Sequence, residues 1–100
     1  MTFDQVCELP TDELSQVVKG CDPQSVLTLL SLRQEIFSKR VIQMFTPKES
    51  QRIAERIVQM PPATVVDIDH AKSEVCKTAG LLFAQGKIGS LFNLTITAAA

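Results

Sequence analysis

Residues 46–60 read TPKESQRIAERIVQM and predict an amphipathic helix whose two ends are both marked. Thr46 and Glu49 have the spacing of a capping box, and Pro47 occupies the first helical position, where its missing N–H does no harm. The two prolines after Met60 remove N–H donors and block continuation of the helix. We therefore expect a helix from Pro47 to about Met60.

The two faces of this expected helix differ in chemistry. Apolar residues at spacings of three and four predict the buried face: Ile53, Ala54, Ile57 and Met60. The opposite face carries Lys48, Arg52, Glu55, Arg56 and Gln59. Such a face is usually only a solvated surface, with ion pairs of about 0.2–0.5 kcal/mol each. Lys48, Arg52 and Arg56 nevertheless place like charges four residues apart, and a partner that carries carboxylates would relieve their repulsion.

Further helices are predicted on both sides, because most candidate starts carry a side-chain acceptor and most ends carry Gly or Pro. We expect helices over residues 3–8, 11–20, 23–30, 33–44 and 64–85, with Asp22 as the cap of the third and Gly86 after the last. The third is apolar almost all round and should be central and buried. The predicted fold is an all-α, compact bundle of about six short helices with the last helix longest. We expect one helical domain over residues 1–88 and a short extended C-terminal tail over residues 89–100.

Charge and hydropathy argue against several classes of function. Ten basic and eleven acidic residues leave a net charge of −1, so no long-range field attracts nucleic acid. The apolar runs fall far short of the ~20 residues that cross a bilayer, and the N-terminus lacks a signal-peptide layout. We expect a cytoplasmic protein with no direct membrane insertion.

Catalytic and metal-binding signals are weak. His70 is expected on the outside of the last helix, and no second ligand stands at a compatible spacing. Apart from Ser73, no hydroxyl or thiol lies one helical turn from His70, and no third group is placed to orient the pair. We therefore predict no catalytic residue, no metal and no cofactor, and a protein that is not an enzyme.

Three cysteines, Cys7, Cys21 and Cys76, are an odd number, and their spacing matches no metal or redox motif. Each has apolar residues nearby, which favours buried free thiols. A redox switch is the alternative interpretation.

The whole pattern resembles the C-terminal domain of the flagellar motor switch protein FliG, without gaps from about Phe3 to Ile88. That family has a Met-Phe-x-Phe hinge, an aspartate opening the third helix, and an Ala-Leu pair before a Lys-Gly-Ala turn. Further along it has a Met-Ser-x-Arg-Ala-Ala stretch followed by paired acidic residues, and then Gly-Pro-Val-Arg, Val-Glu-x-Ala and Gly-Glu-Ile stretches. The positions here that match them, in chain order, are Met1-Thr2-Phe3, Asp22, Leu29-Leu30, Thr46, Lys48, Glu55, Pro62, Ile68, Asp69, Ala71 and Gly86-Lys87-Ile88. The joint spacing carries the resemblance, since no single motif is diagnostic.

The resemblance implies a cytoplasmic rotor ring at the membrane-proximal flagellar basal body. There the charged helix would contact the charged cytoplasmic loop of the stator protein MotA and generate torque, beside other rotor ring proteins and FliG copies. Lys48 and Glu55 would be the retained torque-helix charges. Three positions depart from the family: Ser31 replaces a lysine, Arg56 replaces an acidic residue and Thr64 replaces an arginine. The family's alternating charge set is therefore incomplete here, and Arg52 and Arg56, one turn apart, would compensate by making the charged face of this helix more basic.

Two other classes of function fit parts of the pattern. One is a helical scaffold or interaction module of another ring or secretion assembly, which would use apolar grooves in place of the charged ridge. The other is helix-turn-helix DNA binding through residues 20–40, where Arg33, Lys39 and Arg40 make a small basic spot. The near-neutral charge argues against DNA.

Overall fold

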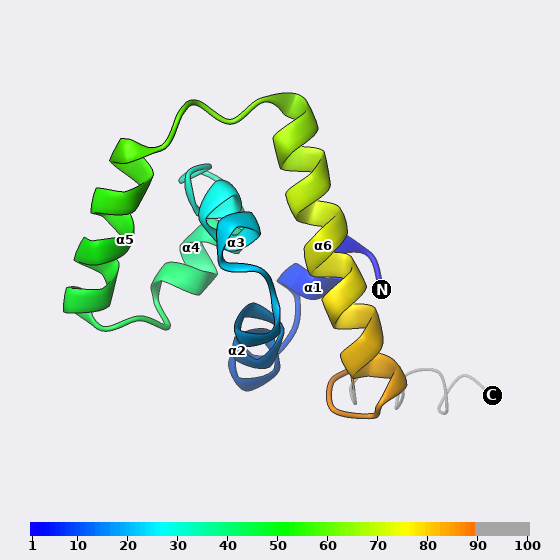
Figure 1. Cartoon of the computed structure of the whole chain (residues 1–100). Coiled ribbons are helices and arrows are strands. Elements are labelled where there is room, and N and C mark those ends of the chain that lie inside the picture. Colours follow the sequence, from blue (N-terminus) through cyan, green and yellow to red (C-terminus); the bar gives the residue numbers. More distant parts are fainter. Residues whose placement is uncertain (90–100) are drawn as a thin grey trace.

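The computed structural model describes residues 1–89, and these contain six α-helices and no strand, which confirms the predicted all-α class (Figure 1). The helices are α1 (Phe3–Cys7), α2 (Thr11–Gly20), α3 (Pro23–Leu30), α4 (Ile36–Ile42), α5 (Pro47–Gln59) and α6 (Val65–Ala84). The last helix is the longest, as expected. Most of the expected C-terminal tail, residues 90–100, lies outside the described residues.

Three helices begin with a reciprocal capping box. The Thr46 hydroxyl accepts the Glu49 N–H at 3.2 Å, and the Glu49 carboxylate accepts the Thr46 N–H at 3.0 Å. The same exchange joins Thr2 with Gln5 at the start of α1. Thr64 opens α6 in this way with an aspartate as its partner. Asp22 precedes α3 as expected but makes no side-chain cap hydrogen bond.

The expected stop at Gly86 is confirmed. Gly86 has φ of 75°, and the N–H groups of Gly86 and Lys87 donate at 3.0 Å to the carbonyls of Phe83 and Leu82 respectively. This pair of bonds is a Schellman motif, which satisfies carbonyls at the end of α6. The chain then turns back, so that Ile88 is 2% exposed within the core and the Gly89 N–H donates to the buried Glu13 carboxylate.

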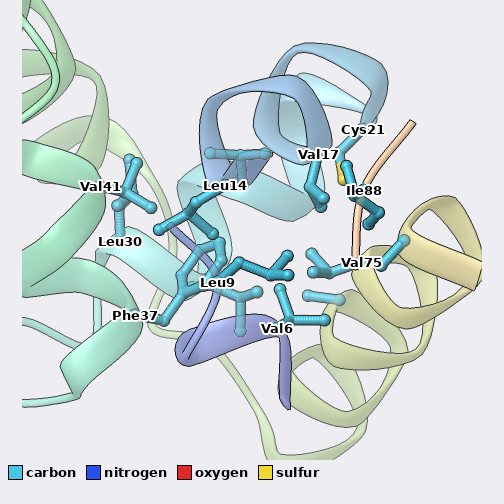
Figure 2. Packing of buried hydrophobic residues seen from close by; sticks show 14 residues of the cluster. Val6, Leu9, Leu14, Val17, Cys21, Leu30, Phe37, Val41, Val75 and Ile88 are labelled. Atoms are coloured by element: carbon cyan, nitrogen blue, oxygen red, sulfur yellow. The ribbon is translucent and has the colours of Figure 1, made fainter. Parts of the chain in front are cut away.

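The core forms mainly where α6 packs against α1, α2 and α3. Figure 2 shows Leu30, Phe37 and Val41 at one end of this cluster and Val17, Cys21 and Ile88 at the other. As predicted, α3 is central: it contacts α4, α5 and α6, and in Figure 1 it lies between α5 and α6. The core residues are Val6, Leu9, Leu14, Val17, Cys21, Val26, Leu29, Leu30, Phe37, Val41, Ala71, Val75, Ala79 and Ile88.

The fourth helix is shorter than predicted, with Ile36–Ile42 in place of residues 33–44. Glu35 is extended at ψ 147°, so the chain leaves a turn and starts a new helix there. The buried Ser38 hydroxyl donates to the Leu30 carbonyl at 3.1 Å, which ties α4 to the end of α3. At the other end, the Met44 and Phe45 N–H groups bond three residues back, and this tighter turn ends the helix.

Candidate partner-binding surface

The expected charged helix is α5, and all four side chains predicted to bind a partner are exposed: Lys48, Arg52, Glu55 and Arg56. Lys48 and Glu55 are two helical turns apart and thus share one side of α5, with Arg52 between them. We call Lys48, Arg52, Glu55 and Gln59 the outer ridge. Because a capping box fixes one end of α5 and Pro61 follows the other, these charges are displayed on a helix of defined length.

The inner face of α5 is less buried than predicted. Ile53, Ala54, Ile57 and Met60 are all only half-buried, and α5 contributes no buried residue. Ile53 and Ile57 pack against the edge of the core, and α3 is the helix that α5 mainly contacts. The prediction of a buried face was therefore wrong in degree, because α5 lies against the side of the bundle and not within it (Figure 1).

Open grooves flank the contact between α5 and α3. The larger groove, of about 490 Å³, is lined by residues of α2, α3 and α5 and by Phe45, which precedes the cap of α5. The smaller groove, of about 300 Å³, lies toward α4. We call the larger one the basic groove, because its lining includes Lys19, Arg52 and Arg56 and no acidic residue. Its apolar lining is Val18, Cys21, Pro23, Val26, Leu27, Leu30, Phe45 and Ile53.

Two arginines of α5 lie elsewhere than the sequence pattern predicted. The sequence placed Arg52 and Arg56 simply opposite the apolar face, whereas both side chains line the edge of the basic groove. Arg56 is displaced by about 80° around the helix from Lys48, which turns it toward α2. The outer ridge and the groove therefore share Arg52, while Arg56 belongs to the groove.

The carboxylate of Glu49, at the start of α5, is hydrogen-bonded to the cap residue of the helix. Hydrogen bonds from the backbone and the side chain of Thr46, with a smaller contribution from Arg52, lower the pKa of Glu49. These hydrogen bonds therefore favour the ionised form of Glu49. Glu55 is the other acidic residue of α5, and it faces outward on the ridge.

The basic spot considered for DNA binding is partly used by the fold. The Arg40 guanidinium donates to the carbonyls of Cys7 and Leu9, each at 2.6 Å, and so satisfies the end of α1. Arg33 and Lys39 are exposed and line the smaller groove. Because Arg40 is committed to backbone groups, the structure weakens the interpretation of these three residues as one nucleic-acid contact.

His70 and the cysteines have the environments of ordinary structural residues. His70 is exposed, and the described residues hold no group of three or more side chains arranged to bind a metal ion. Cys21 is buried and Cys7 and Cys76 are half-buried, all as free thiols. Burial raises the pKa of each cysteine, which lowers the thiolate fraction and disfavours the redox-switch alternative. None of the helices in residues 1–89 combines the length and apolar content needed to cross a bilayer.

Residues 1–89 thus form a small helical bundle that displays a charged, amphipathic helix flanked by shallow grooves. The model of the FliG C-terminal domain family matches residues 1–89, and the chain belongs to that family. The family is that of a flagellar motor switch and rotor protein, whose domains interact with other motor components. No curated protein and no solved structure was found to match the chain.

Proposed function

We propose that this chain, as a cytoplasmic rotor domain at the base of the flagellum, receives torque through the outer ridge of α5. The partner is the charged cytoplasmic loop of the stator protein MotA. Membership of the FliG C-terminal domain family supports the rotor role over a scaffold of another assembly. In this proposal residues 1–88 form the working domain and residues 89–100 its tail.

The exposure of Lys48 and Glu55 on one side of α5 is the observation that supports this contact best. A stepping interface has to form and release quickly, and exposed, screened ion pairs worth about 0.2–1 kcal/mol suit that requirement. A large buried apolar contact would hold the stator too long. The outer ridge offers charges of both signs, so it can meet a loop that carries both.

The departures from the family charge pattern shape the proposal. Arg56 replaces an acidic residue, and the structure directs it to the basic groove. Lys48, Arg52 and Glu55 therefore make the primary stator contact, and the ridge carries two cations and one anion. A stator loop that matches it should present more carboxylates than ammonium or guanidinium groups.

Motility of flagellated cells tests the proposal. The chain should carry Lys48→Glu in one strain and Glu55→Lys in another, and Lys77→Glu, an exposed position on α6, supplies the matched control. We expect slower swimming with both α5 variants, with assembled flagella and normal protein levels, and unchanged swimming with the control. Normal swimming of both α5 variants would remove the charge-contact idea.

A further inference from the structure

We propose that the basic groove between α2, α3 and α5 is a docking site for an acidic amphipathic helix of a protein partner. This site adjoins the outer ridge, with which it shares Arg52, and extends from there over α2 and α3. The inference depends on the shape and chemistry of the groove, so it stands whether or not the outer ridge meets the stator.

The groove has the two features that an amphipathic helix requires. Its floor is apolar and partly open, with half-buried Leu27 and Phe45 beside buried Val26. Its volume of about 490 Å³ is enough for several aliphatic side chains. An amphipathic helix places such side chains at positions i, i+3, i+4 and i+7 along one face, and this face can fill a groove between helices.

The charged side chains at the edge of the basic groove favour an acidic partner. Lys19 approaches from α2 and Arg52 and Arg56 from α5, and no acidic residue is among the lining side chains. Glu49, one turn before Ile53 on the same helix, is held on the Thr46 backbone N–H. Three cations around an apolar floor complement a helix whose apolar stripe is bordered by aspartates or glutamates.

The distribution of charge along the chain strengthens this choice. Residues 19–56 contain seven of the ten basic residues but only four of the eleven acidic ones, so this segment has a net charge of +3 in a chain whose total is −1. The near-neutral total thus conceals an excess of positive charge in the segment from Lys19 to Arg56. Local excess of this kind accelerates association with an acidic segment at low salt.

Other modes of peptide recognition fit this surface less well. Residues 1–89 contain no strand, so this part of the chain offers no sheet edge for an added strand. Recognition of a polyproline segment uses an aromatic-lined groove, whereas Phe45 is the one aromatic residue among the lining side chains. Helix docking is the mode that uses both the apolar floor and the three cations of the lining.

The test uses synthetic peptides of about 18 residues with the whole chain, measured by fluorescence anisotropy at low and moderate salt. The first peptide carries a leucine stripe bordered by glutamates. The second replaces every glutamate with lysine, and the third shuffles the first so that its composition is kept and the stripe is lost. Vesicles of phosphatidylglycerol test whether the groove instead takes an anionic membrane.

Two groove variants and one control locate the site. Arg52→Glu with Arg56→Glu reverses the rim, and Leu27→Gln makes the floor polar. Lys77→Glu with Lys87→Glu changes the net charge equally at exposed positions outside the groove. Circular dichroism and thermal melting confirm that each variant folds. If Leu27→Gln unfolds, the arginine pair, which is exposed, still decides the result.

We expect the acidic peptide with the leucine stripe to bind at least about tenfold more tightly than either of the other two peptides. It should also bind at least about tenfold more tightly than the vesicles. The arginine reversal should weaken it by at least about tenfold, and the lysine control by less than about twofold. Amide shifts in an NMR titration should centre on Val26, Leu27 and Phe45. The proposal is overturned by no binding at about 1 mM, by equal binding of all peptides, by preference for vesicles, or by shifts centred elsewhere.

Discussion

The substitution Ile53→Ala should loosen α5 while leaving the rest of the domain intact. Ile53 anchors α5 at the point where both grooves meet, and it is half-buried. A fully buried Ile→Ala change costs about 2–5 kcal/mol, so partial burial lowers the expectation to about 1–2 kcal/mol. Because α5 has no buried residue and mainly contacts α3, this loss should act on local opening of α5.

Hydrogen exchange of backbone amides, followed by NMR, measures this local opening. In Ile53→Ala, amides of α5 should exchange about 5–30 times faster, while amides around Val75 in α6 change by less than about twofold. Val75→Ala is the matched control, because Val75 is fully buried and its truncation should cost about 2 kcal/mol across the whole domain. If Ile53→Ala accelerates α5 and α6 equally, α5 does not open on its own and the reasoning is refuted.

Three further perturbations test the capping box of α5, the carboxylate of Glu49 and the turn at Gly89. Thr46→Ala should lower the free energy of unfolding by about 1 kcal/mol in denaturant titrations, while Thr46→Ser should change this free energy little. Equal losses in the two variants would argue against the capping box. The pKa of Glu49 is lowered in the folded state, so its contribution to stability is present above the unfolded pKa and disappears as pH falls from about 5 toward 2. Glu49→Gln should flatten that acid dependence, and an unchanged slope would contradict it. Gly89→Ala should destabilise more than Gly86→Ala in thermal melts, since both have positive φ but a Cβ at Gly89 would clash with the Phe83 ring, whereas one at Gly86 would meet open space. The opposite order would show that the turn around Gly89 is not packed as described.

The elements that the sequence predicted well are those set by near neighbours. Thr46 and Glu49 satisfy each other within one turn, and Gly86 ends α6 through its own backbone conformation. Neither feature depends on distant contacts. The start of α5 and the end of α6 were consequently placed within a residue of where they occur.

The features that were missed depend on residues far apart in the chain. Arg40 bonds carbonyls more than thirty positions earlier, and Ser38 reaches back to Leu30. Glu13 joins Gly89 across the whole domain, and nothing in the sequence around Glu13 distinguishes it from an exposed glutamate. The pattern of α4 extended to Met44 because periodicity continues where the helix has already ended.

In the candidate site too, the features set within one helix were predicted and the features set by packing between helices were missed. The exposure of Lys48 and Glu55 follows from the period of α5 alone. The positions of Arg52 and Arg56 beside the basic groove depend on how α2 and α3 dock against α5, which periodicity does not report. Half-burial of the inner face has the same origin, because it is set by how far α5 stands out from the core.

A double-mutant cycle between α5 and the MotA cytoplasmic loop tests the central claim most directly. The affinity of the loop for the whole chain is measured at low salt with Lys48→Glu, with the opposing acidic residue of the loop reversed to lysine, and with both. Each single reversal should weaken binding about two- to fivefold, and the double reversal should restore most of the loss. Additive losses, or affinities that do not respond to Lys48 at all, would contradict a contact through the outer ridge.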